Sequence, residues 1–249
     1  MTESAAETLT AVAILVPVRN EEVLLPRLIA SIESSVAAAS ELRPDLGWMT
    51  VFALDGCTDE SECIVRNAGY PSIHSPAAGV GAARRAAAAL AMNGFVARDI
   101  GSLWLANTDA DSVVPWNWLI HQVDLAEAGA DLVIGSVRPF LDDLDVERRL
   151  AWQSTHRRGQ ALGHVHGANL GIRASSYIAA GGFEAVTEHE DVDLVGRAVA
   201  NGAEPVASDA HAVLTSGRLV GRTAGGYAGY LREQLLPLAE TTDLTAASA

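Results

Sequence analysis

Two aspartates one residue apart, Asp109 and Asp111, are the residues of this chain whose type and spacing most directly suggest chemistry. They follow the apolar run 103–106, which is typical of a buried strand closed by polar turn residues. In open α/β sheets, ligands bind beyond the carboxyl ends of the strands, and this pair occupies that position. Both carboxylates can bind one hard divalent cation there, since Mg²⁺ takes one or two carboxylates together with substrate phosphates. A strand followed by an Asx-type turn is the alternative interpretation.

Two other polar clusters follow predicted strands in the same way. Arg19 and Asn20 come after the apolar run 12–17, and Asp55 with Gly56 ends the predicted strand 48–54. A short third strand is predicted at 72–74, with helices at 21–40, from a cap at 58 or 59 to about 67, and from 79 to about 93. This alternation indicates parallel strands joined by right-handed crossovers. The three clusters are therefore expected to converge on one rim of the sheet.

The second half of the chain is less regular. Its pattern predicts helices at 115–128, 146–159, 174–180 and 188–201, a strand at 131–137, a loop or short strand at 164–171, and short strands at 205–207 and 212–214. An amphipathic helix is predicted within 223–239. No repeat or linker marks a boundary, so one domain over 11–240 is expected, between a disordered leader at 1–10 and a frayed tail at 241–249.

The composition excludes several classes of function. With 31 acidic and 17 basic residues the formal net charge is −14, so general binding of nucleic acid is not expected. Lysine is absent, which removes Schiff-base lysine chemistry and the lysine of a P-loop. Cys57 and Cys63 are too few for a zinc site or a disulfide framework. No signal peptide and no apolar run near the ~20 residues of a membrane span are found, so a cytoplasmic protein without an integral membrane segment is expected.

Six short motifs follow one another along the chain. They lie at 16–21 (VPVRNE), 54–59 (LDGCTD), 79–90, 108–111 (TDAD), 166–169 with 181–183 (HGAN, GGF), and 190–191 (ED). In this order they resemble those of the family 2 glycosyltransferases of the GT-A fold. The resemblance covers roughly 12–216 and implies an α/β fold with a Rossmann-like, mostly parallel mixed sheet flanked by helices. It also implies a nucleotide-binding half at 11–112, an acceptor-binding half at 113–240, and transfer of a sugar from a nucleotide-diphosphate donor, with UDP expected, to a hydroxyl acceptor.

The resemblance implies which residues bind the nucleotide base and ribose. Pro17, Arg19 and Glu21 match the family's first strand end, although an acidic residue at a helix N-terminus explains Glu21 equally well. Asp55 would accept a hydrogen bond from a pyrimidine imide N–H, and the glycine that follows it lets a ligand approach the backbone.

The resemblance also implies a diphosphate and metal site. Gly79 and Arg84 would lie toward the ribose and phosphates, and Arg218 would contact the diphosphate. Asp109 would face the ribose and the metal, and Asp111 would ligate Mn²⁺ or Mg²⁺. The cation would neutralise the diphosphate as it leaves.

On the acceptor side, Asp191 matches the general base of inverting members, with Glu190 as the alternative. Clustering of acidic residues at a helix N-terminus is the structural explanation for the same pair. His166 and Asn169 would line the acceptor site, and His211 is either a further metal ligand or a surface or core histidine. The processive Gln-x-x-Arg-Trp motif is missing from the sequence, which favours transfer of a single sugar.

Several alternatives stay open at this stage. A haloacid-dehalogenase-type phosphatase would use Asp109 as nucleophile and Asp111 as acid/base, but three strand–helix units precede the motif and the phosphate-binding lysine is missing. A non-catalytic nucleotide-sugar binding protein and a retaining mechanism are further possibilities. Beside core packing, the apolar side of the helix within 223–239 is compatible with closure of the acceptor cleft, a homodimer contact or contact with a membrane surface.

Overall fold

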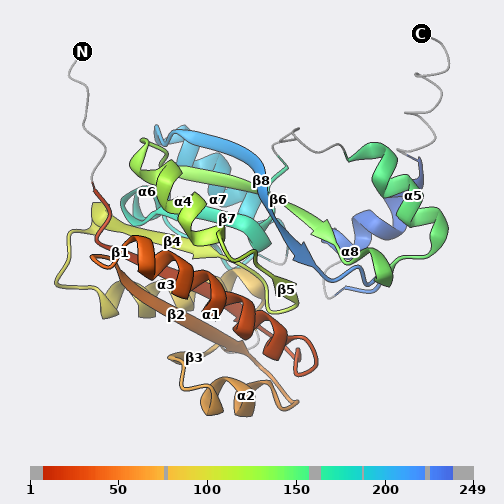
Figure 1. Cartoon of the computed structure of the whole chain (residues 1–249), viewed down its shortest axis with the longest axis horizontal. Helices are drawn as coiled ribbons and strands as arrows, with labels where there is room; N and C mark the ends of the chain where they lie inside the picture. Colours follow the sequence, from red (N-terminus) through yellow and green to blue (C-terminus); the bar gives the residue numbers. More distant parts are fainter. Residues whose placement is uncertain (1–7, 76–77, 157–163, 187, 222–224, 238–249) are drawn as a thin grey trace, which may run out of the picture.

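The computed structural model describes residues 8–75, 78–156, 164–186, 188–221 and 225–237, and its main body is an eight-stranded mixed sheet with helices on both faces (Figure 1). The strands follow the order β3-β2-β1-β4-β7-β6-β8-β5. Their bounds are β1 (Ala11–Val18), β2 (Gly47–Asp55), β3 (Ser72–Ser75), β4 (Leu103–Asn107), β5 (Ser112–Val113), β6 (Leu132–Pro139), β7 (Leu170–Arg173) and β8 (Pro205–Thr215).

The helices fall into two layers and a small separate lobe. Helices α1 and α4 pack on one face of the sheet, α3, α6 and α7 pack on the other, and α5 lies with α8 at the right-hand end of Figure 1. Their bounds are α1 (Leu25–Leu42), α2 (Ser61–Asn67), α3 (Val80–Gly94), α4 (Trp118–Glu127), α5 (Val146–Thr155), α6 (Ala174–Ala179), α7 (Glu190–Ala200) and α8 (Tyr227–Gly229), which continues into a π-helical turn, Tyr230–Gln234. Short 3-10 helices lie at Ile100–Ser102, Leu141–Asp143 and Gly167–Asn169.

Strand β1 is central because its side chains are apolar on both faces. Alternate residues of a strand point to opposite faces, so Val12, Ile14 and Val16 pack toward α1 and α4, while Ala13 and Leu15 pack toward α3. Parallel pairing with β2 on one side and β4 on the other buries the strand completely. This pairing brings the carboxyl ends of β1, β2 and β4 to the same edge of the sheet.

The predicted fold class is confirmed, and the order of the strands explains why the sheet is mixed. The first four strands in the chain are parallel, as the alternating pattern predicts. Strand β7 then inserts between β4 and β6 and runs antiparallel to both. Strand β8 returns parallel to β6, so the second half of the sheet carries the irregularity that the sequence pattern suggests.

Several predicted boundaries differ from the structure. Helix α1 begins at Leu25 and not at residue 21, because Pro26 suits the first turn of a helix and residues 22–24 form a turn. Helix α4 likewise begins at Trp118, three residues after the predicted start. The two short strands predicted at 205–207 and 212–214 are one strand, since β8 pairs with β6 along its length with a register shift between Gly135 and Val137. A β-bulge of this kind breaks the alternation of apolar and polar residues without ending the strand.

The structure describes part of the predicted leader and none of the predicted tail. Residues 8–10 of the predicted leader belong to the folded body, because Leu9 is buried and the hydroxyl groups of Thr10 and Ser102 lie 2.6 Å apart. Residues 1–7 of that leader and the tail predicted at 241–249 lie outside the described residues.

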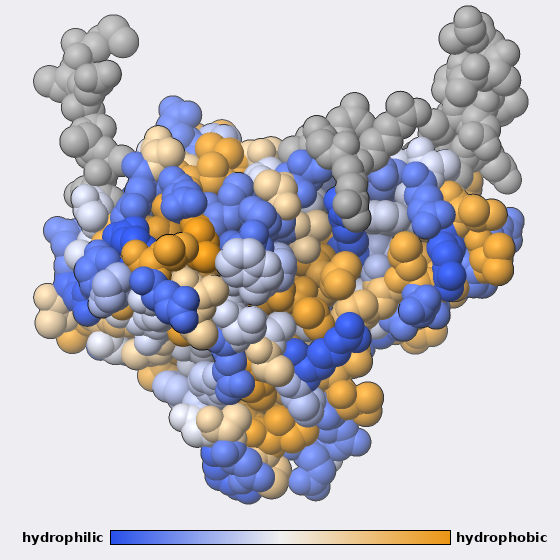
Figure 2. Space-filling model, viewed as in Figure 1, coloured by the Kyte–Doolittle hydropathy of each residue, from blue (hydrophilic) through white to orange (hydrophobic). Residues whose placement is uncertain are grey.

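The small lobe has its own apolar core. Trp152 of α5 packs with Leu231 and Leu235 of the C-terminal helical segment, so the described part of that segment buries its apolar side within the chain. Figure 2 shows hydrophobic surface at the end of the molecule that carries α5, where Val146 and Leu150 are exposed one helical turn apart. A homodimer contact stays a prediction. Across the described ranges, no helix combines the length and the apolar composition needed to cross a bilayer.

Replacement of Gly81 by alanine tests the packing of α3. A Cβ atom at Gly81 would lie 2.1 Å from the carbonyl oxygen of Glu184 and 3.1 Å from the Cβ of Glu190, so α3 would have to move away from the segment that precedes α7. We expect Gly81→Ala to lower the free energy of unfolding by about 1–3 kcal/mol in urea denaturation.

Gly196 provides the matched control in α7, because nothing lies within 4 Å of the corresponding Cβ position. Gly196→Ala should leave stability unchanged or raise it by up to about 1 kcal/mol through helix propensity. Equal stability of the two variants would contradict the close approach of α3.

Candidate active site

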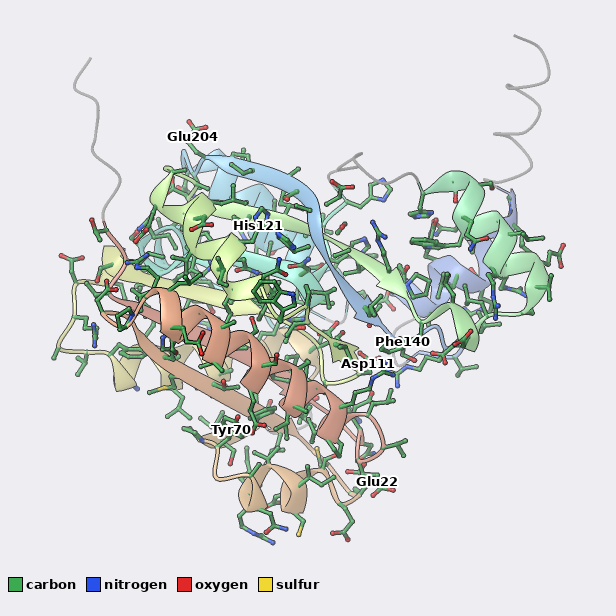
Figure 3. The ribbon with its side chains drawn as sticks, in the orientation of Figure 1. Glu22, Tyr70, Asp111, His121, Phe140 and Glu204 are labelled. Atoms are coloured by element: carbon green, nitrogen blue, oxygen red, sulfur yellow. The ribbon has the colours of Figure 1, made fainter. Side chains whose placement is uncertain are left out.

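A cavity of about 740 Å³ opens at the carboxyl ends of β1, β2 and β4 and extends to the α5–α8 lobe. Figure 3 labels Asp111 near the place where the sheet meets this lobe. The cavity brings together twelve of the fourteen residues that sequence analysis assigns to a site. These are Pro17, Arg19, Glu21, Asp55, Gly79, Arg84, Asp109, Asp111, His166, Glu190, Asp191 and Arg218.

The Asp109–Asp111 turn lies directly beyond the buried end of β4. One carboxylate oxygen of Asp109 receives a 2.5 Å bond from Arg84, which comes from α3. Asp111 is held from the other side, where the Thr215 hydroxyl at the end of β8 donates at 3.4 Å and Arg218 forms an ion pair at 2.8 Å. The two carboxylates are therefore oriented by segments from both halves of the chain.

Negative charge accumulates around Asp111. Burial, together with the neighbouring carboxylates of Asp109 and Glu21, raises the pKa of Asp111 to about 6, while the charge of Arg218 acts in the opposite direction. A carboxylate in such surroundings gains from a cation. Within the described residues no cluster of three or more His, Cys, Asp or Glu side chains forms a metal site. Two protein carboxylates suit Mn²⁺ or Mg²⁺ when substrate phosphates and water supply the remaining ligands.

Arg218 bridges two carboxylates that follow different strands, β1 and β4. Its guanidinium lies 2.8 Å from Glu21 Oε1 and 2.8 Å from Asp111 Oδ2. Glu21 is buried and precedes α1 by four residues, so the interpretation of Glu21 as an acid in the first turn of the helix is wrong. Glu21 instead contributes to the charge of the cavity.

Arg84 connects the metal-site carboxylate to the segment that holds the predicted base. Its side chain is buried, and besides Asp109 it contacts Glu190 Oε1 at 3.3 Å. Its position on α3 follows from the alanine-rich face of that helix, which lets the helix lie close to the sheet. Burial raises the pKa of Glu190, with Asp191 and Asp109 adding to the rise and Arg84 opposing it. The guanidinium is thus engaged by protein carboxylates, and the predicted contact of Arg84 with the nucleotide stays a prediction.

Asp191, at the start of α7, is oriented by two backbone N–H groups. Its Oδ2 accepts a 2.6 Å bond from Gly167, and its Oδ1 accepts a 2.8 Å bond from Val192. His189 precedes the helix in the left-handed region, with φ of 62°, an uncommon conformation for a residue with a side chain. Beside it, burial lowers the pKa of His166 to about 4 although Asp191 raises it, so His166 is neutral at pH 7.

Two further predicted nucleotide contacts lie at the β2 end of the cavity. Asp55 is buried, its Oδ1 accepts a 3.1 Å hydrogen bond from the N–H of Ala78, and its Oδ2 lies 3.5 Å from Arg19. Gly79 begins the turn into α3 with φ of 99°, a conformation that favours glycine. The backbone at Gly79 is therefore exposed to the cavity, beside the partly paired carboxylate of Asp55.

Two predicted site residues are not in the cavity wall. Asn169 is buried, accepts a 2.8 Å bond from the Trp118 indole and donates to the Ser136 carbonyl at 2.8 Å, so it joins α4 to β6. His211 packs edge-on against His121 of α4, with ring centroids 4.6 Å apart. Figure 3 labels His121 and Asp111 in separate parts of the molecule. Both residues therefore lie outside the cavity wall, and the acceptor contact of Asn169 and the metal ligation by His211 stay predictions.

The structure adds cavity residues that sequence analysis did not assign. Trp152 and His156 come from the end of α5, and Tyr227 and Tyr230 come from the C-terminal segment. Trp152 and His156 are spaced i, i+4, and Tyr227 and Tyr230 are spaced i, i+3, so each pair lies on one helical face. This spacing is the signal in the sequence by which the two pairs could have been identified. Arg138, at the end of β6, had no such signal because it stands alone in an apolar strand.

Replacement of Arg84 tests the buried network. Arg84→Met keeps the volume of the side chain but leaves Asp109 and Glu190 without their cation, so we expect a loss of about 3–5 kcal/mol in the free energy of unfolding at pH 7. Arg85→Gln is the control, because Arg85 is exposed on the same helix, and it should change stability by no more than about 0.5 kcal/mol. A neutral effect of Arg84→Met in urea denaturation would refute the ion pairs.

Several solved structures, glycosyltransferases among them, are similar to this fold. Residues 1–349 of TarS from S. aureus superpose with a TM-score of 0.60 at 14% identity, covering 94% of this chain and 65% of that one, so the chain spans about two thirds of the TarS structure. The mannosyltransferase PcManGT of Pyrobaculum calidifontis, in complex with GDP-Man and Mn²⁺, superposes with a TM-score of 0.60 at 17% identity. The match covers 98% of this chain and 77% of that one. Glucosyl-3-phosphoglycerate synthase of Mycobacterium tuberculosis, in complex with phosphoglyceric acid, superposes with a TM-score of 0.51 at 17% identity. The match covers 93% of this chain and 79% of that one.

These similarities confirm the predicted GT-A fold. No curated protein matches the chain in sequence. The family model described as glycosyl transferase family 2 matches residues 13–179, which is well over half of the 249 residues. A match of this extent decides against the haloacid-dehalogenase interpretation of Asp109 and Asp111, and the chain belongs to glycosyl transferase family 2.

Proposed function

We propose that this protein transfers a single sugar from a nucleotide-diphosphate sugar to a hydroxyl acceptor, with a divalent cation and with inversion at the anomeric carbon. The observation that carries the proposal is the convergence of three carboxylates on one cavity. Asp109 and Asp111 come from the turn that follows β4, and Asp191 comes from the start of α7. A donor bound at the strand ends would thus have a cation site on one side and a base on the other.

The donor end of the cavity suits a nucleotide diphosphate. Asp55 provides a buried acceptor for a base N–H, and Gly79 allows close approach of the backbone. Among the similar folds, one TarS structure contains UDP and PcManGT contains GDP-Man with Mn²⁺. UDP is the nucleotide we propose, because Asp55 matches the family position that binds a pyrimidine imide N–H.

Each side chain has a distinct part in the proposed reaction. Asp191, held by the N–H groups of Gly167 and Val192, takes the proton of the acceptor hydroxyl as that oxygen attacks the anomeric carbon. Arg218 exchanges a carboxylate for a phosphate when the donor binds, since its planar fork fits both. Asp109 and Asp111 hold the cation, which supplies Lewis-acid stabilisation of the leaving diphosphate when bound.

Nucleotide binding is the first test of this proposal. We expect UDP to raise the melting temperature in the presence of Mn²⁺ by several degrees more than in its absence, because a ligand at 100 times its Kd stabilises a protein by about 2.7 kcal/mol. GDP and dTDP are measured alongside to determine the preferred nucleotide. If none of the three produces a metal-dependent shift, the donor assignment is wrong.

Two substitutions separate the role of the cation site from that of the base. Asp111→Asn should abolish the metal-dependent part of the UDP shift, because it removes a cation ligand. Asp191→Asn should retain that shift but lower kcat by about 10²–10⁴-fold, since it removes the proton acceptor. Asp193→Asn is the control on α7, where Asp193 is exposed and paired with Arg197. These roles are refuted if calorimetry and product release show that Asp111→Asn keeps the metal-dependent UDP shift while Asp191→Asn loses it. Activity retained in Asp191→Asn would favour another mechanism.

A further inference from the structure

The wall of the cavity farthest from the strand ends differs in chemistry from the donor end. It is built from aromatic and imidazole rings of three segments, the end of α5, the loop before β7 and the C-terminal helical segment. We call this the ring wall and define it by Trp152, His156, His166, Tyr227 and Tyr230. It adjoins Asp191, whose Oδ2 accepts a hydrogen bond from the N–H of Gly167, the residue that follows His166.

The ring wall is a packed structure. His156 stacks on Trp152 with centroids 4.5 Å apart and planes within 9°, and Tyr227 stacks on Tyr230 at 5.8 Å. His166 meets the face of Tyr227 edge-on at 5.6 Å. Such rings offer flat apolar faces with hydrogen-bonding edges. A polyhydroxylated compound, with C–H faces and hydroxyl edges, is complementary to this surface.

The ring wall is uncharged near pH 7. Burial lowers the pKa of His156 and His166, so both imidazoles are neutral. Within the described residues, the Trp152 indole nitrogen and the Tyr227 hydroxyl are buried without a hydrogen bond of good geometry. They provide no charge that would select an ionic ligand.

Arg138 supplies a positive charge beside the ring wall. It lies near the end of β6, is half-buried and lines the cavity, and its charge contributes to the low pKa of His156. No hydrogen bond or ion pair joins Arg138 to any other residue that the structure describes, including the wall carboxylates Glu188 and Asp209. The other arginines of the cavity wall that the structure describes are paired: Arg19 with Asp55, Arg84 with Asp109 and Glu190, and Arg218 with Glu21 and Asp111.

The donor end of the cavity and the ring wall therefore differ in charge. At the donor end the carboxylates outnumber the arginines, so an anionic acceptor group would be repelled there unless a cation intervened. At the ring wall Arg138, which has no partner among the described residues, lines the cavity, and guanidinium binds carboxylate or phosphate bidentately. An anionic group bound at Arg138 would orient the acceptor with its other end toward Asp191.

We propose that the acceptor is a hydroxylated compound that carries a carboxylate or a phosphate, that Arg138 binds this anionic group, and that the ring wall binds the rest. The inference rests on the proposed function and adds to it the chemical class of the acceptor. Arg138 is in this view a specificity-determining residue. It contacts neither the sugar donor nor the reacting oxygen.

Matched acceptors with and without an anionic group test this inference. Glucose, glucuronate and glucose 6-phosphate share one ring, and glycerol, glycerate and glycerol 3-phosphate share one short chain, so both the anion and the body are varied. Binding is measured by calorimetry on the full chain saturated with UDP and Mn²⁺, and transfer is measured with the preferred sugar nucleotide. We expect an anionic member of at least one set to bind about ten- to hundredfold more tightly than its neutral analogue. The carboxylate and phosphate members reveal which anion is preferred.

Substitution of Arg138 completes the test. In Arg138→Gln the preference for the anionic acceptor should disappear, with its KM raised about ten- to hundredfold and the KM of the donor unchanged. Arg138→Lys should recover part of the preference, and Arg85→Gln, the exposed charge-matched control, should have no effect. A normal UDP shift in each variant establishes that it is folded.

The outcomes separate this inference from the proposed function. If no nucleotide binds, the proposed function fails and the inference fails with it. If UDP binds but anionic and neutral acceptors bind equally, or if Arg138→Gln keeps the preference, the proposed function stands and the anionic acceptor is wrong.

Discussion

The structure depends on holding several carboxylates near one another inside a single cavity. Glu21, Asp55, Asp109, Asp111 and Glu190 come from four segments, and all except the half-buried Asp109 are largely shielded from water. Like charges at short range in a protein interior repel strongly, and burial alone favours the neutral acids. Buried or partly buried arginines offset this cost, with Arg84 between Asp109 and Glu190 and Arg218 between Glu21 and Asp111. What remains is a site with excess negative charge, which is suited to a cation and to a proton acceptor.

The sheet makes this arrangement possible. Parallel pairing of β1 with β2 and β4 brings three strand ends to one edge, and the antiparallel strand β7 then turns the chain so that the second half returns to the same edge. The loop before β7 carries Gly167, whose N–H orients Asp191. The long strand β8 ends at Thr215, beside Asp111, and delivers Arg218 to the cavity. Fold and site are thus joined by a few backbone positions.

The two ends of the cavity obey different physical rules. At the donor end, charge dominates, and the geometry is maintained by ion pairs between segments far apart in the chain. At the ring wall, stacking and burial dominate, and the aromatic rings are held by the apolar core of the α5–α8 lobe. Because stacked rings tolerate varied ligands while an arginine selects for anions, the ring wall and Arg138 would divide affinity and specificity between them.

The sequence by itself determined the strands and the family. Apolar runs at β1, β2 and β4, each followed by polar residues, predicted both the parallel half of the sheet and the convergence of Asp55, Asp109 and Arg19, because strand alternation and chain direction are local properties. Helix starts were less predictable, since Pro26 moved α1 away from Glu21. The long strand β8 was also hidden, because its bulge interrupts the pattern.

Only the tertiary structure decided which polar residues meet. Arg84 pairs with Glu190 across 106 positions, and Arg218 reaches both Glu21 and Asp111, so no local pattern could identify these partners. Asn169 and His211 carried the same kind of sequence signal as true cavity residues, yet they face α4 and its neighbours. A motif specifies the type of a side chain and its neighbours along the chain. The direction in which that side chain points, and the charges it meets there, are set by packing between elements distant in sequence.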